Sequence, residues 1–364
     1  MSTTISTSYG MLSTLIANSA NTHQQLDTLT EQASTGLVAQ TYAGLGNGAG
    51  VALDLSPQIS ALQTYQTNIN QATGTMQVTQ TAMTQIQQIA ATFAGDIPNL
   101  NGLNPSEVDS VAAQANAALQ QVADLLNTKD AGSYVFAGQD TGNAPVPSGD
   151  AILSSGFYTQ INAAVAGLSA NGATATTQAT LAIASPTGTS PFSAYLSQPA
   201  SAISAPVVQT GDGGTVQTGL LASANSVAVS PGTTTTPPTS TGSYMRDLMM
   251  SLATLGSMSS SQVGDAGFAA LVQSTGTTLT GVVNTMAEDV GVIGNIQANL
   301  TTTQTQLSDT ATAMTGQLSN VQNVDMASTL SQLTSMQSQL QASYRLITGE
   351  NSLSLLNYLP AAAA

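Results

Sequence analysis

The sequence of 364 residues contains no cysteine, no tryptophan and a single histidine, His23. Without cysteine there are no disulfides and no thiolate metal sites. The one histidine lies in a polar stretch, and no catalytic triad can be proposed around it. The glycine-rich residues 46–50 lack the Lys-Ser/Thr pair of a phosphate-binding loop. We therefore expect no enzyme activity, no cofactor and no metal site.

Charge is scarce as well, at 6% of residues against about 25% in an ordinary soluble domain. Only Lys129, Arg246 and Arg345 are basic, against 18 acids, and the net charge is -15. This balance argues against a nucleic-acid partner, because phosphate recognition needs clustered bases. Surfaces of amides and hydroxyls can be buried against a partner without desolvating many ions. Composition alone does not separate such assembly from drift of one lineage toward low charge.

Long hydrophobic runs are missing too. No stretch of about 18 apolar residues is present, so we expect no membrane insertion. The first residues have neither a basic segment nor a continuous apolar segment, unlike a Sec-type signal peptide. If the protein leaves the cell, we expect another export route.

Residues 56–97 carry the clearest pattern that is present, with apolar side chains recurring every seven positions. A strict seven-residue repeat keeps one stripe of a helix against a partner helix. Ser56 and Pro57 would cap and open this helix, and Pro98 would end it. A second helical pattern follows a short loop, so residues 56–128 predict a helical hairpin. The repeat consists of Leu62, Ile69, Met76, Met83, Ala90 and Ile97.

Both chain ends show apolar residues at spacings of three, four and seven. Residues 3–35 and 244–359 predict long helices, and the glycine-rich residues 36–54 predict an irregular connection. Each glycine inside a helix costs about 1 kcal/mol relative to alanine, so we expect kinks or breaks at 281, 291, 294, 316 and 349. We expect the two ends to associate, with an assembly interface that includes Leu12, Leu15, Leu26, Leu29, Leu333, Leu340, Ile347, Leu353 and Leu356.

Residues 137–243 differ from both ends, because they hold most of the prolines, many glycines and no base. Short Thr/Val/Ala stretches bounded by turn residues predict strands at 181–184, 206–209, 215–218 and 226–229. The Pro/Thr/Ser-rich residues 231–243 are typical of a linker.

The predicted fold is mainly α, a long antiparallel helical bundle or coiled coil formed by both chain ends, with an inserted β-rich domain. Residues 1–54 with 305–364 would form a terminal coiled-coil assembly domain. Residues 55–136 with 244–304 would form a helical-bundle domain, and residues 137–243 an inserted outer domain.

Several motifs resemble the flagellin superfamily. Residues 32–37 (Gln-Ala-Ser-Thr-Gly-Leu) are similar to the family motif that closes its first helix. Residues 317–327 end in Val-Asp-Met-Ala, as the corresponding family segment does. Residues 340–344 and 352–359 follow in the family's order. The resemblance covers about two thirds of the chain and implies termini that are loosely ordered in the monomer and form a coiled coil on assembly.

Within the superfamily, residues 130–138 (Asp-Ala-Gly-Ser-Tyr-Val-Phe-Ala-Gly) resemble an element of the hook-associated protein 3 branch, whose members join hook to filament. Flagellins usually have Asn-Gly after this Phe. The resemblance implies a structural subunit that forms a homo-oligomer ring. Its partners would be a second hook-associated junction protein, flagellin and an export chaperone. Its place would be the extracellular flagellum, reached through the flagellar type III apparatus without a cleaved signal peptide.

Two alternatives remain beside the junction subunit. One is a filament-forming flagellin. The other is a secreted adhesin or hydrolase on a coiled-coil stalk, in which residues 137–243 would hold calcium through Asp140, Asp150 and Asp212. The sequence also departs from the family at residues 38–46, where its usual basic residue and acidic cluster are replaced, and the arginine-rich hairpin is absent. Subunit contacts of the family therefore do not carry over residue by residue.

Overall fold

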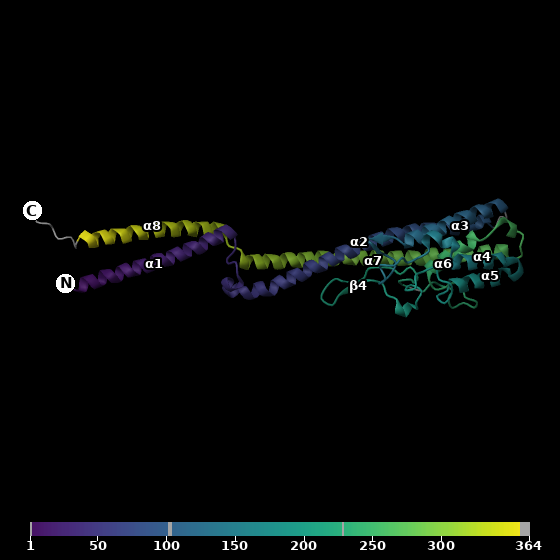
Figure 1. Cartoon of the computed structure of the whole chain (residues 1–364), viewed down its shortest axis with the longest axis horizontal. Helices are drawn as coiled ribbons and strands as arrows, with labels where there is room; N and C mark the ends of the chain where they lie inside the picture. The colour runs from purple at the N-terminus through teal and green to yellow at the C-terminus, as the bar shows by residue number, and fades with distance from the viewer. Residues whose placement is uncertain (1, 101–103, 228, 357–364) are drawn as a thin grey trace, which may run out of the picture. The chain divides into compact units, whose positions relative to one another are not determined.

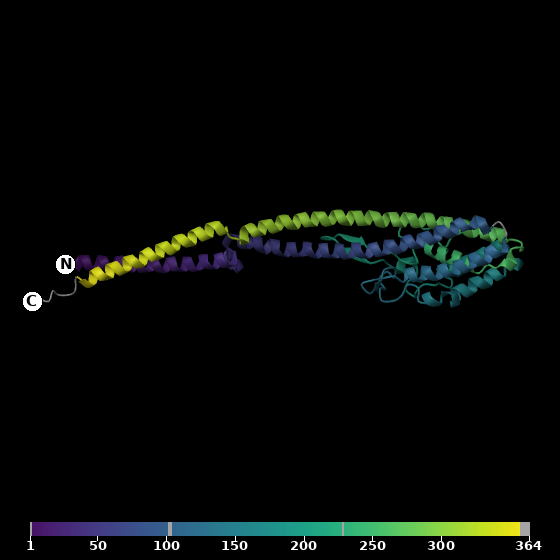
Figure 2. The same cartoon turned by 90° about the horizontal axis from the view of Figure 1, so that it is seen from above.

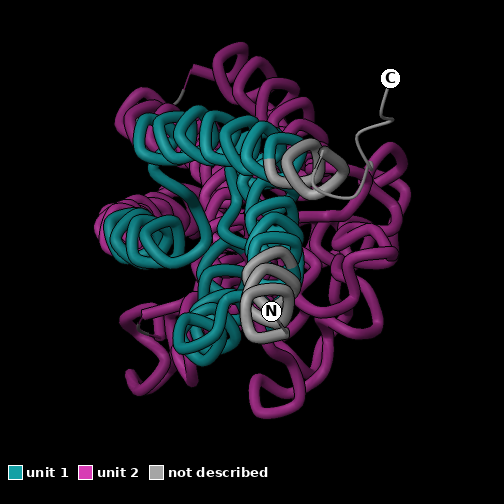
Figure 3. Tube along the Cα trace, turned by 90° about the vertical axis from the view of Figure 1, so that its left-hand side faces the viewer, with its two compact units in different colours: residues 1–63, 308–364 teal, residues 64–307 magenta. Residues whose placement is uncertain are grey.

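The computed structural model describes residues 2–100, 104–227 and 229–356, with side chains undescribed in 2–12 and 350–356. The chain forms two compact units, which we name the terminal unit (Met1–Gln63 with Ser308–Ala364) and the central unit (Thr64–Leu307) (Figure 3). The helices are α1 (Ser2–Thr35), α2 (Ala49–Leu100), α3 (Pro105–Leu126), α4 (Gly156–Ala166), α5 (Leu168–Ala184), α6 (Tyr244–Gly256), α7 (Phe268–Gln322) and α8 (Met326–Leu356). Short 3-10 helices are η1 (Tyr42–Gly48), η2 (Gly149–Ser154), η3 (Ala200–Ala202) and η4 (Ser260–Gln262).

In the terminal unit, α1 and α8 lie side by side and antiparallel (Figures 1 and 2). Their register is set where α1 ends, because Leu37 and Asn323 form an antiparallel bridge. The Val38 amide donates to the Gln322 carbonyl at 2.7 Å, and the Val324 amide donates to the Gly36 carbonyl at 2.9 Å. Association of the two chain ends, and with it the mainly α fold class, is confirmed.

The start of α2 differs from the prediction. The helix begins at Ala49, so Ser56 and Pro57 lie inside it, and the Ser56 hydroxyl donates to the Ala52 carbonyl at 2.7 Å. Ala52 and Ile59 are seven residues apart and stand three positions before Leu55 and Leu62 of the repeat; both are buried and continue the apolar face of α2 toward its N-terminus. Much of the expected irregular connection at 36–54 is therefore helical.

The predicted breaks in the last long helix are wrong. α7 runs unbroken through Gly281, Gly291, Gly294 and Gly316, because packing along the helix outweighs the low helix propensity of single glycines. The break comes after Gln322 instead. Here the Asp325 carboxylate accepts hydrogen bonds from the amides of Ala327 and Ser328 at 3.0 and 3.2 Å, and this capping opens α8.

The central unit holds one apolar core between α2, α3, α6 and α7. The α2 repeat is confirmed in this unit, where its members from Ile69 to Ile97 are buried. α6 is buried over its whole length from Tyr244 to Gly256. The polar residues of α6 are buried together with its apolar ones, among them Arg246, Asp247, Ser251 and Thr254. Its amphipathic pattern in the sequence therefore does not show that the helix lies at the centre of the unit.

The inserted segment contains less strand and more helix than predicted. Strands β3 (Val207–Gln209) and β4 (Thr215–Gln217) pair antiparallel, as the sequence suggested. The strand expected at 181–184 is wrong, since these residues end α5, and the described residues among 226–229 form no strand. Runs of Ala, Thr and Leu are ambiguous between helix and strand, and packing of α5 on α4 and α6 decides the outcome. A second pair, β1 (Lys129–Asp130) and β2 (Ser133–Tyr134), follows α3.

Two glycines of α7 provide a test of this packing. A Cβ on Gly276 would lie 2.7 Å from Ile97 Cγ2, whereas nothing lies within 4 Å of a Cβ on Gly281. We expect Gly276→Ala to lower the free energy of unfolding by about 1–3 kcal/mol, through overpacking against a branched side chain. Gly281→Ala should raise it by about 0.5–1 kcal/mol, because alanine stabilises a helix. Urea denaturation followed by circular dichroism measures both. Equal effects of the two substitutions would contradict the close approach of α2 and α7.

Candidate assembly surface

The predicted assembly residues lie along the contact between α1 and α8. Those whose side chains are described are all half-buried there, namely Leu15, Leu26, Leu29, Leu333, Leu340 and Ile347. The side chains of Leu12, Leu353 and Leu356 lie outside the described residues. These leucines therefore pack within one chain, and a role for them between chains stays a prediction.

This seam is thin. Among the described side chains of α1 and α8, Ser19 and Thr329 are buried, but no apolar residue is. Hydroxyl groups on both helices are satisfied locally, for example by bonds from Thr22 to the Asn18 carbonyl and from Thr334 to the Leu330 carbonyl, both at 2.9 Å. A hydroxyl proton that is bonded within its own helix does not lose a bond to water when the helix face is covered. These faces can accept a further helix at a low desolvation cost.

A second set of apolar side chains stands outside the seam, and the sequence analysis missed it. Of eleven large apolar residues exposed in the described part of the chain, eight belong to the terminal unit, including Ile16, Leu330, Tyr344 and Leu346. Leu346 is 61% exposed and Ile16 is 54% exposed. A signal was present, because Leu330 and Tyr344 lie fourteen residues apart, in step with the seven-residue spacing of the seam. The surface left open for a partner is therefore concentrated on the terminal unit.

Charges on the terminal unit are few and unequal in sign. Arg345 is its one basic residue, and it is exposed. Acidic side chains with described positions include Asp27 and Glu31 on the exposed side of α1. His23 Nδ1 lies 3.1 Å from the Asp27 carboxylate, one turn along the same helix. The two helices thus present acid on α1 and a lone base on α8.

The chain matches two family models. The model of the bacterial flagellin N-terminal helical region matches residues 5–141, and that of the flagellin C-terminal helical region matches residues 277–359, together more than half of the chain. The chain belongs to the flagellin family. Flagellin-family proteins are structural, so this protein is a structural subunit of the extracellular bacterial flagellum and not an enzyme. Family membership also implies self-association and flagellar partners.

A solved structure of a candidate flagellar hook-associated protein from Vibrio parahaemolyticus is a distant match. It is 13% identical, the match covers 75% of this chain and 96% of that chain, and the TM-score is 0.48. No curated protein matches the sequence. Both family models leave residues 142–276 uncovered, so this flagellin-family chain carries its own inserted segment.

Buried charges hold this inserted segment in place. Arg246 on α6 is 2% exposed and donates to the carbonyls of Ser223, Ala184 and Leu196, each at 3.4 Å. Burial lowers the pKa of Arg246 to about 10, which leaves the guanidinium charged at neutral pH. Its neighbour Asp247 has a pKa raised by burial, although hydrogen bonds from Ser240 at 2.6 Å and from the Thr241 amide at 2.8 Å oppose that shift.

Asp289 of α7 makes a second anchor. Its two carboxylate oxygens accept from the amides of Ser226 and Val227 at 2.9 and 3.1 Å. Burial, with the nearby Asp289 charge, raises the pKa of Tyr244 well above its usual value. Asp289 is structural, because both of its oxygens accept from backbone amides of the inserted segment. The sequence analysis named Arg246 only as one of the three bases of the chain.

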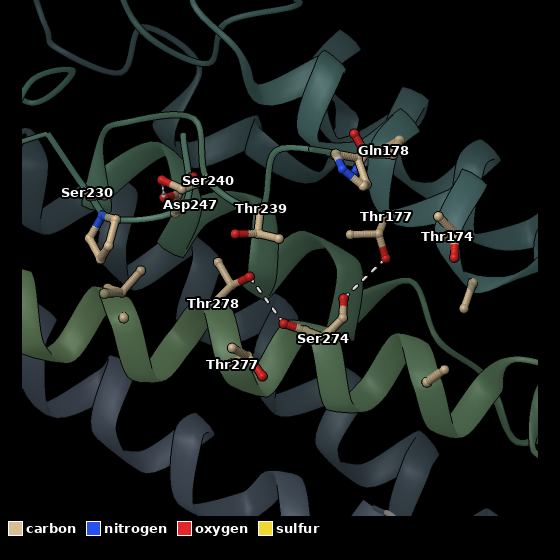
Figure 4. Close-up of a pocket in the computed structure, with 17 residues that line it drawn as sticks. Thr174, Thr177, Gln178, Ser230, Thr239, Ser240, Asp247, Ser274, Thr277 and Thr278 are labelled. Atoms are coloured by element: carbon tan, nitrogen blue, oxygen red, sulfur yellow. Dashed lines mark hydrogen bonds between the residues drawn. The ribbon is translucent and has the colours of Figure 1, made fainter. Parts of the chain in front are cut away.

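A cavity of about 560 Å³ lies in the central unit between α5, α7 and residues 230–240 (Figure 4). Its hydroxyls are mostly occupied: Thr177 and Ser274 bond to each other at 3.1 Å, and Thr278 bonds to the Ser274 carbonyl at 3.1 Å. The Gln178 amide donates to the Pro238 carbonyl at 2.9 Å. Among the described residues that line it, none is basic and Asp247 is the one acid. Saturated hydroxyls and one buried carboxylate form no catalytic set.

The acidic residues of the inserted segment and the composition of the helices bear on the alternative functions. In the part of the chain that the structure describes, no group of three or more His, Asp or Glu side chains is placed to hold a metal ion. Asp140, Asp150 and Asp212 are thus not brought together, and Asp140 accepts from the Asn143 amide at 2.8 Å instead. None of the described helices combines the length and apolar character needed to cross a membrane.

Proposed function

We propose that this flagellin-family chain joins the hook to the filament as a hook-associated junction subunit. The supporting observation is the element at residues 130–138, which resembles the junction branch rather than the filament flagellins. The proposal includes three functional parts: a terminal assembly domain (1–54 with 305–364), a helical-bundle domain (55–136 with 244–304) and an outer domain (137–243).

The geometry of that element supports a fixed structural role. Phe136 is 1% exposed in the core, and Ala137 forms a bridge with Leu221 of the inserted segment. Gly138 has φ +67°, and a Cβ there would lie 2.8 Å from the Ser204 carbonyl oxygen. Only glycine fits this position without strain. Phe136, Ala137 and Gly138 therefore hold the chain that follows α3 and the β1–β2 pair against the inserted segment.

Self-association through the terminal hairpins would form the ring. The seam of α1 and α8 is thin, and most of the exposed apolar residues lie on the terminal unit, so packing against neighbouring copies adds the burial that one hairpin lacks. A second hook-associated junction protein and flagellin would contact the two ends of the ring. Export would use the flagellar type III apparatus with a chaperone, consistent with a chain that has no cysteine to oxidise.

A seeded assembly experiment distinguishes a junction subunit from a filament-forming flagellin. Purified full-length chain is added to sheared filament seeds and to isolated hooks, and growth is followed by electron microscopy. We expect a short cap of fixed length on the hooks and no elongation of the seeds. Long filaments grown from this chain alone would overturn the junction role and support a filament flagellin. Absence of any self-association would overturn both.

A further inference from the structure

A buried carboxylate lines the cavity between α5, α7 and residues 230–240. Asp247 of α6 is 2% exposed, and Figure 4 shows it beside Ser240. It accepts hydrogen bonds from the Ser240 hydroxyl at 2.6 Å and from the Thr241 amide at 2.8 Å. A carboxylate offers about four lone-pair sites, so acceptor capacity remains on Asp247.

Asp247 has no direct counter-ion among the residues that the structure describes. The chain has one histidine and three bases, all with described side chains, and none places a nitrogen within 4.0 Å of this carboxylate. The neighbouring Arg246 donates to three backbone carbonyls and to the Ser190 hydroxyl instead. Asp247 stands in the first turn of α6, where the helix dipole favours its charged form. A buried anion without a counter-ion favours a ligand that brings positive charge.

The hydroxyls in the wall present acceptors to the same space. Thr277 and Thr278 each give their hydroxyl proton to a carbonyl of α7 at 3.1 Å, and Ser240 gives its own to Asp247. A hydroxyl has one proton, so these groups offer lone pairs to a ligand. The lining residues, which are all described, include no base and no aromatic ring. An anion or a stacked aromatic ligand therefore finds no partner in this wall.

The remaining wall is aliphatic, and the cavity has the size of a small-molecule site. Its volume of about 560 Å³ lies within the range of about 300–1000 Å³ that such sites occupy. One carboxylate balances one positive charge, so the further ammonium groups of a polyamine would be desolvated without a partner. The apolar part of the wall comes from Ala173, Pro231, Pro237, Ala270 and Val282.

We propose that this cavity binds a small aliphatic primary amine, with its ammonium group at Asp247 and Ser240 and its alkyl body between α5, α7 and the two prolines of the loop. A primary amine is protonated at neutral pH, as the lysine side chain is. Its three N–H donors match a wall that offers mainly acceptors. The site lies wholly in the central unit, so it does not depend on how copies of the chain assemble.

Calorimetric titration of the full-length chain with three probes of one shape tests the charge preference. The probes are cyclohexylamine, cyclohexanol and cyclohexanecarboxylate. We expect the amine to bind at least about 10-fold more tightly than the alcohol, and the carboxylate not to bind.

Asp247→Asn tests the role of the carboxylate, because asparagine keeps an acceptor for the Thr241 amide and loses the charge. The preference for the amine over the alcohol should fall to within about 3-fold. Glu288→Gln is the matched control, since it removes one negative charge from an exposed position on α7. It should leave the preference unchanged, which separates the site from general attraction by the net charge of -15.

Filling the cavity tests the location independently of charge. Gly281 lines the cavity seven residues after Ser274 on the same face of α7, and nothing lies within 4 Å of a Cβ placed there. Gly281→Leu should therefore occupy the cavity and weaken binding of the amine at least about 10-fold. Gly291→Leu is the control, because its Cβ position is equally open but lies outside the lining, and it should bind as the original chain does.

Each of the other outcomes overturns the proposal. Equal binding of amine and alcohol by the original chain, or no amine binding at about 10 mM, would show that the carboxylate does not select a cation. Amine binding that survives both Asp247→Asn and Gly281→Leu would place it on the acidic surface of the molecule. If circular dichroism shows that Asp247→Asn does not fold, the comparison of Gly281→Leu with Gly291→Leu decides, and equal binding by these two variants overturns the site.

Discussion

Replacing Arg246 with alanine is expected to lower the free energy of unfolding of the central unit by about 3–5 kcal/mol, because it removes a buried, fully engaged charge. Urea denaturation followed by circular dichroism measures the change. The substitution leaves carbonyl oxygens of the inserted segment without donors and Asp247 without its neighbouring cation. Unsatisfied buried acceptors and an uncompensated buried carboxylate both carry large penalties.

The contacts of Arg246 explain why one side chain has so large an effect. Its guanidinium lies 5.0 Å from the centre of the Phe192 ring and donates to the Ser190 hydroxyl at 3.3 Å, in addition to its three carbonyl acceptors. These partners come from the end of α5 and from the loops of the inserted segment, while Arg246 itself sits on the buried α6. The side chain therefore connects the buried α6 to the inserted segment.

Two further substitutions make the prediction specific. Arg246→Lys should remain strongly destabilising, because an ammonium cannot reproduce the planar fork of donors. Arg345→Ala removes the same residue type from an exposed position and should change the stability of the monomer by less than about 0.5 kcal/mol. A loss below about 1 kcal/mol for Arg246→Ala would show that the carbonyl contacts are not maintained in solution.

The sequence predicted the helical framework well because its signals are periodic. The seven-residue stripe from Ile69 to Ile97 and the pairing of the two chain ends follow from the spacing of apolar residues. The spacing of apolar residues could not show where tertiary packing overrides the local preference for strand, turn or helix end. Residues 181–184 are helical because α5 packs on its neighbours, and Pro57 lies inside a helix whose apolar face continues through the buried Ala52 and Ile59.

The candidate assembly surface was predicted only in part, for a related reason. Periodicity identifies residues that face some partner but does not say whether that partner belongs to the same chain. Leu333 and Leu340 are half-buried on α8, which packs on α1 of the same chain. Tyr344 and Leu346 lie off that stripe, and the folded hairpin shows that their side chains are exposed.

In the free monomer, backbone amides of residues 13–35 and 326–349 should exchange with solvent about 100-fold or more faster than those of α6. Hydrogen exchange measured by mass spectrometry tests this in the full-length chain. Isolated helices are only marginally stable in water, so the free energy needed to open a helix locally comes mainly from its tertiary contacts. Within the described residues, α1 and α8 bury no apolar side chain, whereas α6 is buried throughout.

On assembly, the same amides should become protected, because neighbouring copies would cover Ile16, Tyr344 and Leu346. The change in protection then measures the free energy that contacts between copies add to a hairpin that is weak by itself. Slow exchange of residues 13–35 in the monomer would mean that the coiled coil is already complete within one chain. Assembly would then have to join preformed hairpins, and folding of the termini could no longer be the step that links subunit to subunit.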